Sequence, residues 1–230
     1  NSPAAKTGAY EVPEKVEEIR PSAFINAKIE TVTFAGESAL KNIGKKAFEN
    51  SAIKSFVLPA GVAKINEETF KNCEKLASFT FNDAVTDIGV SAFENCEALS
   101  EVKLPASVRN ISTAAFKNAG LKTLDIGEGT SKIAASAFEG NGSLSKLALG
   151  SNLKTMGEKV FADCKALKAV ELPAELVDFE ANAFEGCSSL KTIAVAADSS
   201  AFKAVDNAVY NADGTKLVFA GTSELAALTI

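Results

Sequence analysis

The sequence predicts a β-dominated α/β repeat fold, a solenoid of about eight coils of 22–24 residues followed by a C-terminal β-hairpin extension. Three observations predict it. An Ala-Phe dipeptide or a close variant recurs along the chain with a constant period. A short alternating pattern, L-x-x-h-x-h with h a large apolar residue, follows each of these Phe residues. The repeat then stops, and an Asp-Gly turn flanked by alternating apolar residues takes its place.

The recurring Phe defines the first structural column. Five residues before it lies a large apolar residue, and three residues earlier lies another apolar position, at which Thr130 is the one polar member. A single short coil cannot bury six apolar columns, but stacked coils turn them into one continuous core. We therefore expect Phe116 to be buried between Phe93 and Phe138. The full column is Phe24, Phe48, Phe70, Phe93, Phe116, Phe138, Phe161 and Phe184.

The h-x-h part of the second pattern is a two-residue alternation, which predicts a short strand with one buried face. Pro59, Pro105 and Pro173 directly follow such strands and would end them. A turn is expected two residues after each Phe, because that column contains residues that tolerate a left-handed backbone. Its members are Asn26, Asn50, Asn72, Asn95, Asn118, Gly140, Asp163 and Gly186.

The chain divides at about residue 197. Residues 1–197 form the predicted solenoid, and residues 198–230 form the extension, with a hairpin over Phe202–Phe219 that would cover the last coil. Residues 220–230 align without gaps to residues 2–12, which suggests that the extension leads toward a further repeat. The absence of an initial Met and of a signal peptide then suggests a processed or trimmed product.

The segments LSEVKLPASVRNISTAAFKNAG and LASFTFNDAVTDIGVSAFENC show the unit most plainly. Over residues 12–195 the chain resembles the BspA-like (Treponema pallidum type) leucine-rich repeats of bacterial surface proteins. It differs from commoner leucine-rich repeats because it lacks the Asn or Cys two residues after the strand motif. The resemblance implies a right-handed solenoid and a non-enzymatic, extracellular or cell-surface adhesion protein. Implied partners are a host extracellular-matrix protein or another bacterial surface protein, bound by a monomer.

Composition excludes several other functions. The chain has no His, so serine–histidine and cysteine–histidine catalysis cannot occur within it. A formal charge of −5 with only two Arg argues against a nucleic-acid surface. The longest apolar runs are far shorter than a membrane span requires. Surface localisation would therefore depend on an export signal that this sequence does not contain.

The cysteines share one column, three residues after the Phe: Cys73, Cys96, Cys164 and Cys187. Ala27, Ser51, Ala119 and Asn141 occupy the same column, so the niche favours a small side chain and the Cys are expected to be buried thiols. Disulfides between Cys73 and Cys96, or between Cys164 and Cys187, remain possible if their Cβ vectors converge. A four-cysteine zinc site is disfavoured because the two pairs lie three coils apart.

Several carboxylates lie near one another on the predicted strands, but they do not predict an enzyme. Glu101, Asp125 and Glu171 alternate with lysines on an open sheet, which favours cross-strand charge pairing over a glycosidase pair in a pocket. Asp213-Gly214 has no calcium-loop spacing and predicts a turn. We expect no catalytic residue, no metal and no cofactor.

The remaining candidate is the surface formed by the outward strand positions, since repeat proteins generally bind partners on such extended sheets. These positions contain no Trp, Tyr, Phe or Arg, the types that dominate interfaces or stack on sugars. That composition also fits the alternative, a structural spacer that presents other domains and has no ligand of its own. If a partner binds, we expect it at the charged centre: Glu101, Lys103, Asp125, Lys146 and Glu171.

Overall fold

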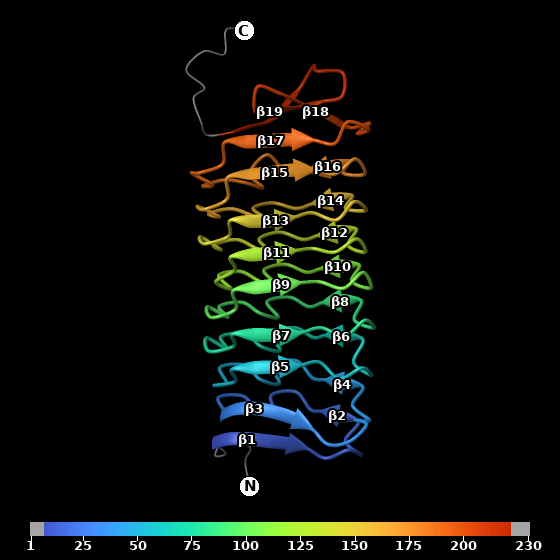
Figure 1. The fold of residues 1–230 in the computed structure, drawn as a ribbon, viewed down its shortest axis with the longest axis vertical. Coiled ribbons are helices and arrows are strands. Elements are labelled where there is room, and N and C mark those ends of the chain that lie inside the picture. Colours follow the sequence, from blue (N-terminus) through green and yellow to red (C-terminus); the bar gives the residue numbers. More distant parts are fainter. Residues whose placement is uncertain (1–6, 222–230) are drawn as a thin grey trace.

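The structure, a computed structural model, describes residues 7–221, most of which form a stack of β-coils (Figure 1). One side, which we call the strand face, consists of parallel strands. The predicted solenoid is confirmed, and the described residues contain no helix. The strands of this face are β1 (Thr7–Val12), β3 (Lys28–Phe34), β5 (Ser55–Val57), β7 (Ser78–Thr80), β9 (Glu101–Lys103), β11 (Thr123–Asp125), β13 (Lys146–Ala148), β15 (Ala169–Leu172) and β17 (Thr192–Val195).

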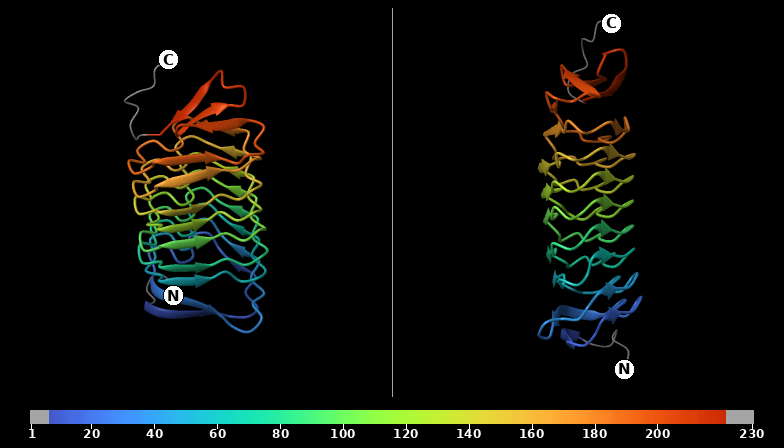
Figure 2. Two further views of the ribbon diagram at one scale, coloured as in Figure 1. Left: turned by 45° about the horizontal axis from the view of Figure 1, so that its top comes forward. Right: turned by 90° about the vertical axis from the view of Figure 1, so that its right-hand side faces the viewer.

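A second stack of parallel two-residue strands, which we call the back sheet, lies across the core from the strand face (Figure 2). It runs unbroken from β6 to β16. In each coil the chain passes from the back sheet through a turn that contains the recurring Phe, and then reaches the next strand of the strand face. The back strands are β2 (Glu18–Ile19), β4 (Asn42–Ile43), β6 (Lys64–Ile65), β8 (Asp87–Ile88), β10 (Asn110–Ile111), β12 (Lys132–Ile133), β14 (Thr155–Met156) and β16 (Asp178–Phe179).

The Phe column forms the centre of the core, as predicted. Successive rings from Phe24 to Phe184 stack nearly parallel, with centroids 4.9–5.6 Å apart. Phe116 is fully buried and lies 4.9 Å from Phe93 and 5.3 Å from Phe138. Thr130, the polar member of its column, is buried with its hydroxyl donating to the Ile126 carbonyl at 3.0 Å. The core is therefore continuous from coil to coil.

The turns around the Phe column, which we call the turn side, also repeat in register. The Asn column has the predicted left-handed backbone, with Asn72 at φ 58°. From Asn50 to Asn118, each side-chain amide donates to the Asn side-chain carbonyl of the preceding coil, for example Asn72 Nδ2 to Asn50 Oδ1 at 2.8 Å. A second left-handed position, two residues before the Phe, was not expected from the sequence and includes Glu68 at φ 54°. Backbone amides of the turns donate to the next coil, such as Phe24 N to the Ala47 carbonyl at 2.7 Å.

The end of the described chain forms an antiparallel sheet over the last coil. It comprises β18 (Phe202–Val205), β19 (Ala208–Asn211) and β20 (Leu217–Ala220). The predicted hairpin is present between β19 and β20, and an additional tight turn at Asp206 and Asn207, with φ 49° and 62°, joins β18 to β19. Phe219 packs against Phe184 at 5.8 Å, so this sheet covers the core as expected. The segments 2–6 and 222–230, which fall within the internal alignment, lie outside the described residues.

Candidate functional site: the strand face

The residues predicted to bind a partner all lie in strands of the strand face. Glu101 and Lys103 are in β9, Asp125 is in β11 and Lys146 is in β13, and these strands form one parallel sheet. The register places Asp125 beside Lys103, and Thr123 between Glu101 and Lys146. Glu171 is in β15, which belongs to a separate sheet with β17. The structure therefore gathers four of the five residues on one sheet and places the fifth beyond its edge.

The expected cross-strand charge pairing is not found. Among the described residues, no ion pair within 4 Å involves any of these five side chains. Although Asp125 is the register partner of Lys103, its Oδ1 accepts a hydrogen bond from Gly127 N at 3.0 Å, in the turn after its own strand. This local bond gives the carboxylate a partner other than the lysine. The prediction of charge pairing on this face is therefore wrong.

The turn side differs in this respect, because its charges form ion pairs between neighbouring coils. Lys71 lies 2.8 Å from Glu94, and Lys117 lies 2.9 Å from Glu139. The pKa of Lys71 is raised, chiefly through its hydrogen bond to Glu94 and further by the charges of Glu94 and Glu68. The five charged residues predicted to bind a partner thus lack ion pairs of the kind that the same residue types form on the turn side, and that Glu30 of β3 forms with Lys54 at 2.7 Å.

Two breaks divide the strand face into three sheets, β1-β3-β5-β7, β9-β11-β13 and β15-β17. At the residue after β5, β9 and β11, the backbone amide donates to the next coil: Leu58 N to the Thr80 carbonyl and Leu104 N to the Asp125 carbonyl, both at 2.9 Å, and Ile126 N to the Ala148 carbonyl at 3.0 Å. Phe81 and Leu149 follow β7 and β13 in the same way, but their backbone amides donate no hydrogen bond to any described residue. The coils thus separate on this face at two places, while the back sheet remains paired.

The inward side chains at both breaks are less buried than those of the other central strands. Phe79 and Phe81 at the first break, and Leu147 and Leu149 at the second, are only half-buried. Val102 in β9, by comparison, is 3% exposed. The outward positions contain no Phe, as expected, but the first break partly exposes two inward rings. The ring centroids of Phe79 and Phe81 are 4.7 Å apart. The two rings occupy inward positions where the next coil has Val102 and Leu104.

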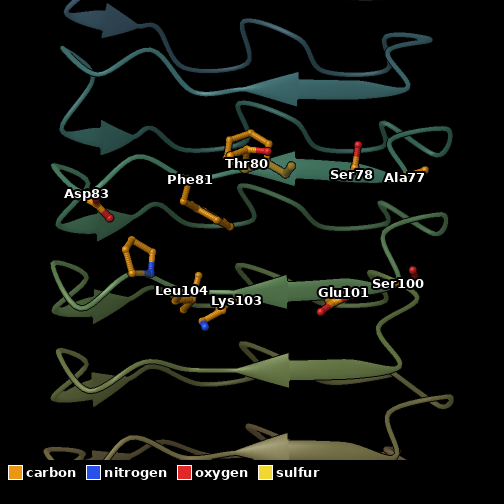
Figure 3. Close-up of a pocket in the computed structure, with 11 residues that line it drawn as sticks. Ala77, Ser78, Thr80, Phe81, Asp83, Ser100, Glu101, Lys103 and Leu104 are labelled. Carbon is orange, nitrogen blue, oxygen red and sulfur yellow. The ribbon is translucent and has the colours of Figure 1, made fainter.

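Each break contains a pocket on the strand face. The first has a volume of about 510 Å³ and lies between β7 and β9 (Figure 3). Its lining combines the half-buried rings with polar and charged groups, among them Ser78, Phe79, Thr80, Phe81, Asp83, Glu101 and Lys103. The second has a volume of about 570 Å³ and lies between β13 and β15, with a lining that includes Leu147, Ala148, Leu149, Glu128, Glu171, Glu175 and Asp198. The sequence does not predict these pockets, because the repeat pattern is the same in coils with and without a break.

The cysteines are buried thiols in the structure, and they bond to the backbone of the preceding coil. Cys73 Sγ donates to the Phe48 carbonyl at 3.0 Å, and Cys96 Sγ donates to the Phe70 carbonyl at 3.1 Å. Burial raises the pKa of Cys73 to about 11, so this thiol stays protonated at neutral pH and is a poor nucleophile. Asn141 fills the same column and donates to the Phe116 carbonyl at 2.9 Å. The column is therefore structural.

The acidic residues do not form a metal site in the described part of the chain. Within residues 7–221, no group of three or more Cys, Asp or Glu is placed to hold a metal ion. Asp213 has the predicted turn role, with its Oδ1 accepting hydrogen bonds from Thr215 N at 2.9 Å and Thr215 Oγ1 at 2.6 Å. The same residues include no helix long and apolar enough to cross a membrane.

The coil pattern, the Phe column and the open strand face together define a leucine-rich repeat protein. The BspA type leucine-rich repeat region matches residues 5–122 and 86–214, in six copies, and the chain belongs to this family. Among solved structures it is similar to the T. pallidum leucine-rich repeat protein, with 29% identity and a TM-score of 0.63, covering 69% of this chain and 77% of that one.

A second similar structure is the pneumococcal vaccine antigen PcpA. It shares 21% identity with a TM-score of 0.50, and the match covers 84% of this chain and 63% of that one. At this identity the likeness concerns the fold. No curated protein sequence matches the chain. Family membership identifies a repeat scaffold of the kind that generally mediates protein interactions.

Proposed function

We propose that the chain is a non-enzymatic, extracellular or cell-surface adhesion module that binds a protein partner through the strand face. The observation that supports this most is the absence of ion pairs for Glu101, Lys103, Asp125, Lys146 and Glu171, while the turn side has many. A partner can pair with these five charges, four of which are exposed, without first breaking an ion pair within the protein, so electrostatic complementarity can direct binding to this face.

The partner class follows from the family and from the shape of the surface. An extended sheet suits a large protein surface or a long segment better than it suits a small molecule. We therefore propose a host extracellular-matrix protein or another bacterial surface protein as partner, bound by the chain as a monomer.

A structural spacer is the second candidate, and the continuity of the stack supports it. The parallel Phe rings, the Asn ladder and the unbroken run of β6 to β16 connect each coil to the next along the axis. Such a rod could hold other domains at a fixed separation without binding anything itself. The two candidates differ in whether the strand face has a ligand.

A binding screen distinguishes them. The protein is tested by surface plasmon resonance against immobilised matrix proteins and bacterial surface proteins, together with the double variant Lys103→Glu/Lys146→Glu. The matched control is Lys64→Glu/Lys132→Glu, which reverses two exposed lysines of the back sheet. We expect the strand-face variant to change affinity for any partner by about tenfold or more, and the control to leave it unchanged. Binding to nothing supports the spacer, and equal binding by all variants refutes the charged site.

A further inference from the structure

The two pockets at the breaks lie at either end of the sheet that contains four of the predicted charges, and a third pocket of about 590 Å³ lies beside β3 and β5, where there is no break. The first is bounded by β7 and β9, and the second by β13 and β15, with β11 between them. Both have half-buried apolar side chains in their lining, Phe79 and Phe81 in one and Leu147 and Leu149 in the other. Each volume lies within the range that receives a ligand group or a large side chain. The face thus offers two apolar anchor points separated by a polar strip.

Charge distinguishes what these pockets can accept. The second pocket is lined by the carboxylates of Glu128, Glu171, Glu175 and Asp198, and by no Lys or Arg. The first is lined by two carboxylates and one amine, those of Asp83, Glu101 and Lys103. None of these side chains forms an ion pair in the described chain. A partner that meets both pockets therefore needs positive charge, because bringing acidic groups here would leave like charges together.

The distance between the pockets fixes the length of a segment that could reach both. The breaks are three coils apart along the stack, and adjacent strands of a sheet are spaced by about 4.8 Å, which gives about 14 Å. An extended chain advances about 3.3 Å per residue, so about four residues span that distance. In an extended segment, side chains at positions i and i+4 point to the same side. A single short segment can thus fill both pockets.

From this geometry we propose that the strand face binds an extended, lysine- or arginine-rich segment of a protein partner that runs along the stack axis. An aromatic side chain enters the first pocket, against the edges and faces of Phe79 and Phe81. An aliphatic side chain four residues away enters the second pocket, against Leu147 and Leu149. The basic residues between and beside these anchors face Asp83 and Glu101 at one end and the four carboxylates at the other. This specificity rests on the proposed binding function.

The test uses a defined peptide and measures affinity by fluorescence anisotropy at low salt. The probe is the labelled peptide Lys-Phe-Lys-Thr-Lys-Leu-Lys, whose Phe and Leu are four residues apart. Its controls have the same composition with Phe and Leu adjacent, or Glu in place of every Lys. We expect the probe to bind about tenfold more tightly than the adjacent-anchor control, and the acidic control not to bind. Binding of the probe should weaken as salt rises.

Protein variants locate the binding. Thr80→Trp and Ala148→Trp place a large ring at an exposed position in the lining of the first and second pocket. Thr33→Trp makes the same change at the equivalent, exposed position of β3, which lines the third pocket and lies outside both breaks. All variants are first checked for native circular dichroism and melting. We expect each pocket variant to lower probe affinity by about tenfold and the control to have no effect.

Several outcomes would overturn the proposal. Equal affinity for the two anchor spacings, or pocket variants that bind the probe like the parent protein, would show that the pockets do not recognise such a segment. Binding of a neutral glycan that Thr80→Trp abolishes, with no peptide binding, would assign the pocket to another ligand class. If a partner from the screen is lost in Lys103→Glu/Lys146→Glu but retained in both pocket variants, the binding function stands and this proposal fails.

Discussion

The turn side and the strand face are built by the same repeat, yet they differ in how neighbouring coils are joined. On the turn side each coil is connected to the next by backbone hydrogen bonds, by the Asn ladder and by ion pairs such as Lys71–Glu94. On the strand face the pairing stops at β7 and at β13, and the five charged residues predicted to bind a partner have no ion pair in the described chain. Stacking is therefore secured on one side, which leaves the other side able to vary without loss of the fold.

The largest expected effect comes from the stacked core. Phe116→Ala should lower the free energy of unfolding by about 3–5 kcal/mol, because it removes a fully buried ring and leaves a cavity between two neighbours. Phe81→Ala, at the first break, should cost clearly less, about 1–2 kcal/mol, because that ring is only half-buried. Urea unfolding of both variants measures the difference. Equal losses would mean that the strand face is packed as tightly as the turn side.

The buried thiols should make stability fall in alkaline solution. The pKa of Cys73 is raised by burial from 9.0 to about 11, so between these values the unfolded chain loses a proton that the folded chain keeps. Stability present below pH 9 is thus lost as pH rises through this range, by about 2–3 kcal/mol for this group. Cys73→Ala, which copies Ala27 and Ala119 of the same column, should lack this component.

The measurement is the free energy of unfolding of the parent protein and Cys73→Ala from pH 8 to pH 11. Lysines and tyrosines titrate in both proteins, so the difference between the two curves isolates the thiol. As the pH rises over this range, the free energy of unfolding should fall more steeply for the parent protein than for Cys73→Ala. Parallel curves would contradict the burial of this thiol.

The Asn ladder should have a smaller effect. Asn72→Ala removes the hydrogen bond that Asn72 donates to Asn50 and the one that it accepts from Asn95. It also places alanine, whose side chain cannot hydrogen-bond to the nearby backbone, in a left-handed conformation. We expect a loss of about 2 kcal/mol. Asn72→Gly, which copies Gly140 and Gly186 of this column, should lose only about 1 kcal/mol, because glycine adopts this backbone without strain. Thermal and urea unfolding check both values, and the same loss for both variants would refute the backbone argument.

The smallest effect compares one paired lysine with one unpaired lysine. Lys71→Met should cost up to about 1 kcal/mol, because it breaks the bridge to Glu94 and Glu68, and salt should reduce the loss. Lys103→Met should change stability by less than about 0.5 kcal/mol, since this side chain is exposed and has no ion pair in the described residues. A larger loss at Lys103 than at Lys71 would reverse the proposed contrast between the two sides.

The sequence was sufficient for the parts of the fold that depend on residue spacing. The Phe column, the left-handed Asn turns and the β19–β20 hairpin all follow from periodic positions or turn residues. The turn at Asp206 and Asn207 was missed because it lies within a run treated as one strand.

The breaks could not be predicted from the repeat pattern. Phe79 and Phe81 satisfy it as well as Val102 and Leu104 do, and only the three-dimensional arrangement shows that the strands separate between them. The placement of the five charged residues on the strand face followed from the alternation. Their lack of ion pairs did not, because it depends on side-chain conformation, as the Asp125–Gly127 bond shows.

The division of the strand face into three sheets is tested most directly by amide hydrogen exchange, measured residue by residue by NMR. The decisive amides are those that follow the strands. Leu58, Leu104 and Ile126 donate to the next coil at 2.9–3.0 Å, whereas Phe81 and Leu149 have no such bond in the structure. We expect Phe81 and Leu149 to exchange at least about tenfold faster than the other three. Equal protection of all five amides would show that the strand face is continuous and would contradict both the breaks and the pockets between them.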